Sequence, residues 1–541
     1  MKSKIKQWNP KTKLHIGLFS AALFLWLVTF WTDRKTFTKD PLNMNSFPIH
    51  SDAVLFMHIA SKLLVFLVIF GMLLFLSYGL QHKKLLFAFI GFFLVYFVLL
   101  LCSYPGYFMG DDTIIFGYAT RYYSVYWHNY LTSLYFMVGM SLFPASTGPI
   151  ILHDMCLSLV FSYIFYQTDR LFQIKAKYLI ILCGLMPFVL LSALMCFRPV
   201  LYSPFLLFFL AFLVFEKRKE EELTLAKLLF LTALAALLCF WRSEGILLFF
   251  FCFLLIPVCY SIKWKKMIVF FIAFVVFFSG IRLPQSVGEK KYYGSDYLII
   301  STIRPLSLII HREQTYPGAE EDLKNIDAVV DLSYISYETL SCSSYNRYNS
   351  DHNRGRFTET GADKETQSRY LKSALRLIAK NLDLFFAERL QLFLVTNGIY
   401  DYDKSLVMDL EPVTTYKFHL YQSDRDYGFL LVDGNKRLPI NGGKDLALFL
   451  FQYGGEAYLP VLILLILTCI YTLTKKKWLL FWMCLSLIAR EGVIFLTAPA
   501  SFVQYNYPTM FSAIFLFIYT ILEAIEEKKT SLDNKQKGNK S

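Results

Sequence analysis

The chain has 541 residues, of which 56% are hydrophobic and 18% are charged, and its mean hydropathy is +0.44. Ordinary soluble domains are about 45–50% apolar and about 25% charged, so this composition excludes a disordered chain, a collagen-like chain and a typical soluble enzyme. Apolar runs recur along most of the length, which excludes a single membrane anchor on a globular body. The sequence therefore predicts a protein that crosses the membrane many times.

The net charge also bears on the class of protein. Lys and Arg total 54 while Asp and Glu total 41, which gives +13. A basic surplus can indicate nucleic-acid binding, but here the cations gather in short clusters between apolar runs, as orientation signals do. We therefore expect no nucleic-acid partner. The cysteines lie mostly in apolar runs without CxxC or Cys/His ligand spacing, so we do not expect a zinc site.

A transmembrane helix needs about 20 apolar residues. By that criterion we expect an all-α polytopic protein with about twelve transmembrane helices. Their expected positions are Leu14–Trp31, Ala53–Tyr78, Leu85–Ser103, Pro149–Tyr166, Tyr178–Cys196, Leu201–Phe215, Leu225–Trp241, Gly245–Tyr260, Met267–Ile281, Tyr458–Leu473, Trp478–Pro499 and Met510–Ile525. The basic clusters then fall on one side, which places both termini in the cytoplasm of a multi-pass cell-membrane protein.

The expected spans divide the chain into four regions. An N-terminal transmembrane region, 1–281, includes a long outer loop, 104–147. Residues 282–457 form a mainly helical extracytoplasmic domain, 458–525 a C-terminal transmembrane region, and 526–541 a basic cytoplasmic tail. The extracytoplasmic domain is expected to hold an amphipathic helix on the membrane surface, with apolar residues at helical spacing: Leu371, Leu375, Ile378, Leu382 and Phe385.

The outer loop 104–147 carries two neighbouring carboxylates, Asp111 and Asp112. A carboxylate here can take a proton from an acceptor hydroxyl that attacks a sugar carbon, or it can hold a divalent cation. On a helix the two side chains point about 100° apart, so we expect one to act while Asp112 caps a helix over 113–123. The alternative is a solvated turn. A short run, 130–143, predicts a helix along the membrane interface.

Charged residues also stand at or within the apolar runs. Arg490 and Glu491 lie inside an expected span, where an unpaired charge costs at least a few kcal/mol. They predict either an ion pair with a neighbouring helix or a phosphate site, since a guanidinium binds phosphate through two parallel bonds. Each arginine alone could instead be interfacial, and His128 could simply pack beside Trp127. The candidates for phosphate or substrate binding are Arg121, His128, Arg198, Arg242, Glu244, Arg282 and Arg490.

This plan resembles the GT-C superfamily of integral-membrane glycosyltransferases. The resemblance rests on the many spans, the outer domain before the last spans, and an acidic motif in the first outer loop, Tyr104-Pro105-Gly106 … Gly110-Asp111-Asp112, with a short helix after His128-Asn129. The segment Pro499 … Gln504-Tyr505-Asn506-Tyr507-Pro508 is similar to an Arg-Tyr-containing outer turn of bacterial members. It departs from that turn by having Gln504 and Asn506 where an arginine is expected.

The resemblance implies that a sugar moves, with inversion, from a polyprenyl-phosphate-linked donor to a glycan or glycoprotein of the cell envelope. The active site would face away from the cytoplasm, among membrane lipids. Asp111 or Asp112 would be the general base or a metal-associated acid, and Arg242 and Arg490 would contact the donor phosphate. The lipid-linked sugar is the co-substrate, and a divalent cation is the one cofactor the resemblance leaves open.

Three alternatives remain: a transporter or flippase of lipid-linked saccharides, a polysaccharide polymerase, and a non-catalytic envelope assembly protein. A transporter needs polar sites near the middle of the membrane. We expect the early spans to be nearly devoid of such sites, and this expectation favours the glycosyltransferase.

Overall fold

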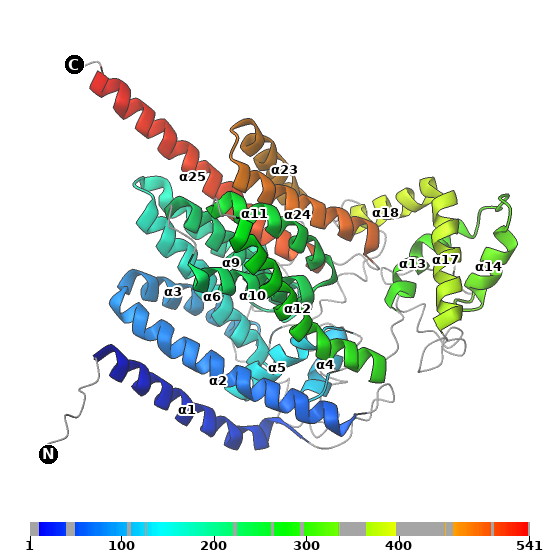
Figure 1. The fold of residues 1–541 in the computed structure, drawn as a ribbon, viewed down its shortest axis with the longest axis horizontal. Helices are drawn as coiled ribbons and strands as arrows, with labels where there is room; N and C mark the ends of the chain where they lie inside the picture. Colours follow the sequence, from blue (N-terminus) through cyan, green and yellow to red (C-terminus); the bar gives the residue numbers. More distant parts are fainter. Residues whose placement is uncertain are drawn as a thin grey trace. The chain divides into compact units, whose positions relative to one another are not determined.

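The computed structural model describes residues 10–38, 49–104, 106, 110–124, 126, 128–219, 224–260, 264–292, 297–333, 335, 364–396, 450, 458–498 and 503–538. Across these residues the chain is helical and has no strand (Figure 1). Nine of the described helices are long and apolar enough to cross a membrane, and Tyr130–Leu142, Leu225–Trp241 and Tyr458–Thr474 are shorter apolar helices. The chain is thus a polytopic helical membrane protein, with fewer long spans in its described part than the twelve expected.

The chain divides into two compact units, which we describe separately. Unit 1 holds the described residues up to 124 and from 130 to 198, and unit 2 holds those from 126 to 129 and from 199 onwards. The helices of unit 1 are α1 (Pro10–Thr36), α2 (Ser51–Gln81), α3 (Lys83–Cys102), α4 (Gly110–Ala119), α5 (Tyr130–Leu142), α6 (Gly148–Leu171), η1 (Lys175–Ile181), α7 (Leu182–Leu185) and α8 (Pro187–Ser192).

In unit 1, α1 packs along α2, and α3 packs along α6. The short helix α5 contacts α1, α2, α4 and α6. It is buried on nearly every side, from Tyr130 to Ser141. The expectation that this helix is amphipathic is therefore wrong. A helix with apolar residues all round must be covered, either by protein or by lipid, and here the neighbouring helices cover it.

One expected span of unit 1 is not a continuous helix. Residues 178–196 were expected to cross the membrane, but they form the end of η1 followed by the short helices α7 and α8. The break falls at Met186, whose backbone is extended (φ −63°, ψ 142°), immediately before Pro187. The proline ring disfavours helical backbone in the residue before it, so the helix must restart at Pro187.

Unit 2 contains most of the remaining helices. They are α9 (Arg198–Lys219), which begins at the last residue of unit 1, α10 (Leu225–Trp241), η2 (Ser243–Gly245), α11 (Ile246–Tyr260), α12 (Trp264–Tyr292), α13 (Tyr297–Ile309), α14 (Ala319–Asp327), α17 (Lys364–Lys380), α18 (Leu382–Thr396), α23 (Tyr458–Thr474), α24 (Trp478–Thr497), η4 (Val503–Asn506) and α25 (Tyr507–Gly538). Helix α10 packs on α12, α11 on α24, and α23 on both α24 and α25.

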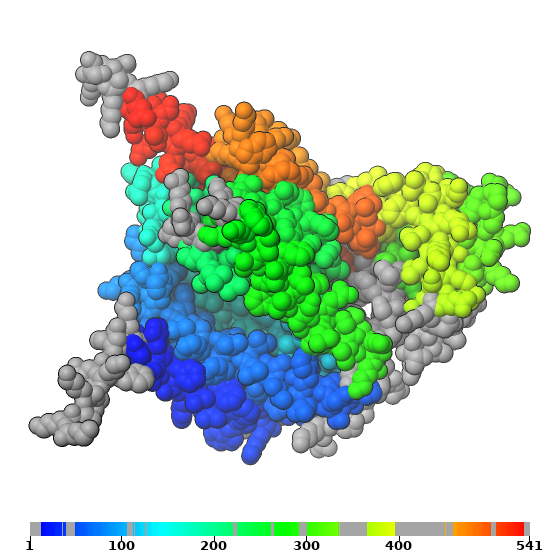
Figure 2. Space-filling model, in the orientation of Figure 1, coloured from blue at the N-terminus to red at the C-terminus, as the bar shows by residue number. Residues whose placement is uncertain are grey.

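Helix α12 carries an apolar surface. Ile272, Val276 and Leu283 are exposed along it, and α12 (green) forms part of the face drawn in Figure 2. An exposed apolar helix surface of this kind suits contact with lipid chains. The helix continues past the expected end of its span at Ile281 and includes Pro284 before it ends at Tyr292.

Helices α13, α14, α17 and α18 enclose a small apolar core of their own, which includes Ile303, Ile326, Tyr370 and Leu377. The single amphipathic helix expected here is instead two helices, α17 and α18, which meet at Asn381. The buried stripe of α17 is Tyr370, Ala374 and Leu377, while Leu375 is exposed. The predicted stripe is thus displaced by one residue, because the tyrosine, alanine and leucine face the core of these four helices.

A buried ion cluster joins α13 to α18. Arg304 Nε donates to Glu388 Oε1 at 2.8 Å, and Arg389 forms an ion pair with the same carboxylate. Arg389 Nη1 also donates to the carbonyl of Ala498 at 2.7 Å, just after α24. Glu388 and Arg389 are fully buried. Removing one member would leave an uncompensated buried charge, so the cluster fixes these helices together.

Candidate functional site

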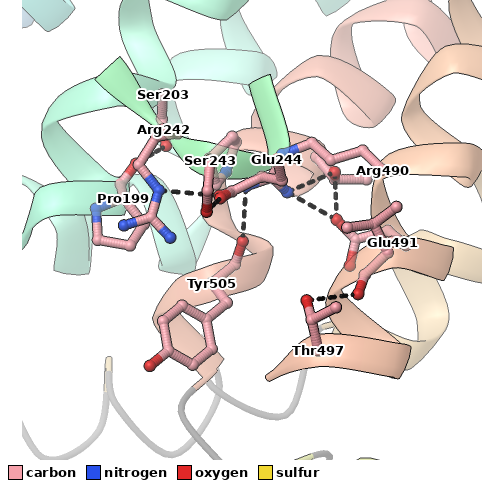
Figure 3. Close-up of polar contacts among 12 residues, drawn as sticks. Pro199, Ser203, Arg242, Ser243, Glu244, Arg490, Glu491, Thr497 and Tyr505 are labelled. Atoms are coloured by element: carbon pink, nitrogen blue, oxygen red, sulfur yellow. Dashed lines mark hydrogen bonds and ion pairs between the residues drawn. The ribbon is translucent and has the colours of Figure 1, made fainter. Parts of the chain in front are cut away.

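Four charged side chains form a buried network where η2 meets α24 (Figure 3). Arg490 Nη2 donates to Glu244 Oε1 at 2.9 Å, and Arg490 Nη1 donates to Glu491 Oε1 at 2.8 Å. Arg242 Nε donates to the same Glu244 oxygen at 2.8 Å. Glu244 therefore accepts from two guanidinium groups that come from distant parts of the sequence.

Neighbouring helices complete this network. The Tyr458 hydroxyl of α23 donates to Glu491 Oε2 at 2.6 Å, and Thr509 of α25 donates to the other oxygen of the same carboxylate. Arg490 further donates to the carbonyl of Tyr505 at 3.0 Å and to Thr509 Oγ1 at 3.2 Å. Two positive and two negative charges compensate one another, as a membrane-buried cluster requires.

The geometry separates the roles of the two arginines. The Arg490 side chain is 5% exposed and is bonded to two carboxylates, so it is an internal ion-pair partner. The Arg242 side chain is 12% exposed, its guanidinium lies 5.9 Å from the ring centre of Tyr505, and Ser243 beside it is exposed. A ligand that approaches this network would therefore meet Arg242 first, with Glu244 holding the guanidinium in place.

The two candidate carboxylates lie on α4 in unit 1. This helix begins at Gly110 and ends at Ala119, so both aspartates belong to its first turn, and the predicted cap and helix over 113–123 are wrong. Asp112 is 2% exposed, and its charge acts on the nearby Cys196. The side chain of Asp111 lies outside the described residues. Acidic residues are favoured in a first turn because the helix dipole is positive there.

The other candidate residues lie on several elements. Arg121 is buried, and its Nη1 donates to the Gly117 carbonyl at 2.9 Å, which satisfies a carbonyl near the end of α4. Arg198 is half-buried at the start of α9, and Arg282 is exposed on α12. His128 is buried, and its backbone carbonyl accepts from Gln285 Nε2 of α12 at 3.1 Å.

The segment from Tyr126 to Asn129 is fixed to two helices of unit 2. Gln285 Nε2 donates to the Tyr126 carbonyl at 3.0 Å, and Asn129 Nδ2 donates to the carbonyl of Phe240 on α10 at 2.7 Å. The Tyr126 ring lies against Gly288, where a Cβ atom would be 2.1 Å from Tyr126 Cδ1. Only glycine allows this approach. Trp127, the predicted packing partner of His128, lies outside the described residues.

A charged pair that the sequence reasoning missed lies in unit 1. Lys62 of α2 forms an ion pair with Asp33 of α1, and both side chains are nearly buried. Lys62 Nζ also contacts Thr29 Oγ1 at 3.2 Å and Ser141 Oγ at 3.5 Å. The signal in the sequence is one lysine inside an otherwise apolar run. Its partner could not be chosen without the packing of α1 against α2.

The backbone after α4 adopts an unusual conformation beside this pair. Tyr122 has φ 54°, and its ring stacks between Phe37 and His58, each with ring centres 4.1 Å away. Burial, and the carboxylate of Asp33 nearby, raise the pKa of Tyr122. A bulky residue in left-handed backbone costs free energy, and such residues cluster at functional segments. The segment after α4 is therefore held in place by α1 and α2.

Two further polar residues lie in an early span. His153 and Asp154 of α6 are fully buried, and neither the ring nitrogens nor the carboxylate oxygens have a hydrogen-bond partner among the described residues. Together with Lys62 of α2, they contradict the expectation that the early spans are nearly devoid of polar sites. Ionisable residues inside spans are functional candidates by default.

Within the described ranges, no group of three or more His, Cys, Asp or Glu side chains is placed to hold a metal ion. The sequence and structure define a multi-pass helical membrane protein with a compensated Arg–Glu network in one unit and a buried acidic helix start in the other. No protein-family model matches the chain, and neither a curated protein nor a solved structure matches it.

Proposed function

We propose that the chain is a GT-C-like glycosyltransferase that moves a sugar from a polyprenyl-phosphate-linked donor to an extracytoplasmic acceptor of the cell envelope. The observation that carries the proposal is the position of Asp112, which is 2% exposed in the first turn of a helix that follows a transmembrane helix. A carboxylate held there near the positive end of the helix dipole can stay ionised and accept a proton.

The proposed reaction has one displacement step. The acceptor oxygen bonds to the anomeric carbon of the sugar while the bond from that carbon to the phosphate oxygen breaks. The hydroxyl proton passes to Asp111 or Asp112, and the electron pair of the broken bond leaves with the lipid phosphate. An inverting transfer needs only one base and a stabilised leaving group.

Arg242 is the proposed phosphate ligand within unit 2. Its side chain is the most exposed of the four charged side chains in the network, and Glu244 orients it by accepting the 2.8 Å hydrogen bond from Nε. Arg490 would position Glu244 rather than touch a phosphate, because its Nη1 and Nη2 both donate to groups within the protein. Arg121, Arg198, His128 and Arg282 remain secondary candidates for contact with the substrates.

A transporter or flippase of lipid-linked saccharides is the second candidate. Lys62, His153 and Asp154 lie buried within helices long enough to span the membrane, and transporters use such residues along their pathways. This observation supports transport more strongly than the sequence alone did. The polymerase and the assembly protein gain no comparable support.

The test is sugar transfer by the purified full-length chain in lipid nanodiscs. A panel of polyprenyl-phosphate sugars would be offered with cell-envelope glycans and glycoproteins as acceptors. Transfer of sugar to an acceptor, with release of polyprenyl phosphate, is the expected result. Absence of transfer from every donor, together with movement of a lipid-linked sugar across proteoliposomes, would overturn the proposal in favour of the flippase.

A further inference from the structure

Asp154 lies inside a transmembrane helix, and no described residue forms an ion pair with it. It is fully buried on α6, and neither carboxylate oxygen has a hydrogen-bond partner among the described residues. Helix α6 is one of the long apolar helices, and Asp154 lies about 9 Å along it from Gly148. The favourable dipole effect falls off within the first turn, so the helix start does not stabilise a negative charge here.

The groups that face Asp154 come from the helices packed against α6. Tyr96 of α3 and Tyr135 of α5 lie near its charge. The Tyr96 hydroxyl donates to the Gly184 carbonyl at 2.8 Å, and the Tyr135 hydroxyl donates to Cys156 Sγ at 3.7 Å. Both hydroxyl protons therefore point to acceptors other than Asp154.

The remaining titratable neighbours in the described part of the chain form no hydrogen bond or ion pair with Asp154. Cys183 of α7 lies beside Tyr96, and His153 is the adjacent residue on α6, also fully buried. The lysine that η1 places against α6 is Lys177, and it pairs with Asp169 at 2.6 Å. Asp169 is about 22 Å further along the helix than Asp154.

Asp169 shows what an ionised carboxylate on α6 requires. It pairs with Lys84 at 2.7 Å as well as with Lys177, so two cations compensate its charge. Among the described residues, Asp154 has neither a paired cation nor a hydrogen-bond donor. A buried carboxyl in that position is less costly as the neutral acid than as an anion, because burial penalises only the charged form strongly.

We infer that Asp154 is a proton-binding site in the membrane region of this protein, and that its carboxyl carries a proton at neutral pH while α3, α5 and α6 are packed together. The ligand is a single proton, and the inference does not depend on the proposed sugar transfer. If water reaches Asp154 when these helices separate, the carboxyl releases that proton. Lowering the pH therefore favours close packing of the three helices, and raising the pH favours their separation.

Infrared spectroscopy tests this inference on the full-length chain in lipid nanodiscs. The chain would be labelled with aspartate that carries carbon-13 in its side-chain carboxyl, so that protonated aspartic acid is identified by its isotope-shifted C=O band. We expect this band at neutral pH in the wild type. In Asp154→Asn its intensity should fall by the contribution of one carboxyl group or vanish. In Asp169→Asn its intensity should stay unchanged. Asp169→Asn is the matched control because it alters an ionised carboxylate on the same helix.

Two results would overturn the inference: no protonated aspartic acid band in the wild type at neutral pH, or an unchanged band in Asp154→Asn. The wild-type spectrum needs no variant, so the test survives if Asp154→Asn fails to fold. Asp154→Glu gives a second check, because it keeps a carboxylic acid but removes the labelled group. We expect the labelled band to fall there as well, and an unchanged labelled band would also contradict the inference.

Discussion

Arg490 and Glu244 are 246 residues apart in the sequence, yet Arg490 Nη2 donates to Glu244 Oε1 at 2.9 Å. Both side chains are 5% exposed. The pair joins η2 to α24 and brings Arg242 into the same network through the shared oxygen. A buried charge that loses its partner is strongly unfavourable, so this contact couples the stability of the protein to the geometry around Arg242.

Replacing Glu244 by glutamine should destabilise the protein. Glu244→Gln leaves Arg242 and Arg490 without their shared negative charge, and removal of one partner from a buried pair costs about 3–5 kcal/mol. The measurement is the thermal unfolding midpoint of the purified chain in detergent. Glu365→Gln is the control, because the Glu365–Arg369 pair is exposed and such pairs contribute about 0–1 kcal/mol. Equal unfolding midpoints for the two variants would contradict the prediction.

The Lys62–Asp33 pair predicts non-additive effects. Lys62→Met and Asp33→Asn each leave one nearly buried partner behind and should each lower the unfolding midpoint. The double variant removes both charges and should be more stable than the sum of the single effects implies, with a coupling of about 0.5–3 kcal/mol. Lys84→Met is the control for loss of a lysine, since the Lys84 side chain is 69% exposed. Strict additivity would show that the two charges do not interact.

Two glycines on α12 should respond differently to alanine. A Cβ atom at Gly288 would lie 2.1 Å from Tyr126 Cδ1, whereas at Gly280 it would meet nothing within 4 Å. Gly288→Ala should therefore cost about 1–3 kcal/mol through overpacking, and Gly280→Ala should be neutral or stabilising by up to about 1 kcal/mol. Thermal unfolding compares the two. A stable Gly288→Ala protein would mean that Tyr126 does not rest on this glycine.

The Arg312–Asp383 pair predicts a small, pH-dependent contribution to stability. Arg312 makes two bonds to the carboxylate, at 2.9 and 2.6 Å, and this contact lowers the pKa of Asp383. A lowered pKa in the folded state gives stability that is present above the unfolded value of about 3.9 and is lost as the pH falls below it. The unfolding midpoints of wild type and Asp383→Asn should thus differ slightly at neutral pH and low salt. The two unfolding midpoints should converge in acid. A difference between them that grows in acid would contradict the prediction.

The nine long apolar helices of the described residues lie where spans were expected, because length and hydropathy are local properties of the sequence, whereas the span expected over 178–196 is not a continuous helix. Helices α2 and α3 agree with the expected spans to within about three residues, which is the usual uncertainty of such boundaries. The break at Met186 could have been expected from Pro187, because proline restricts the residue before it. The polar end of α12 could not be predicted in this way, since hydropathy detects only the apolar part of the helix. Helix α12 continues to Tyr292.

The candidate site was only partly predictable. Arg490 and Glu491 stood out because a charge in an apolar run is costly. Glu244 is the carboxylate between Arg490 and Arg242 because η2 packs against α24. No local sequence pattern predicts that packing. Lys62 and Asp154 show the same sequence pattern as Arg490, namely an ionisable residue in an apolar run, but their packing environments depend on neighbouring helices.

The proposed role of the first-turn aspartates is tested by the rate of sugar transfer by Asp111→Asn and Asp112→Asn beside the wild type. Asparagine keeps the size of the side chain but cannot accept a proton, so the variant at the general base should lose about 10²–10⁴-fold in transfer rate. Asp383→Asn is the control, because Asp383 is an exposed aspartate on α18. We expect this loss in one first-turn variant, with an unchanged unfolding midpoint. Full transfer by both variants would contradict the proposed role.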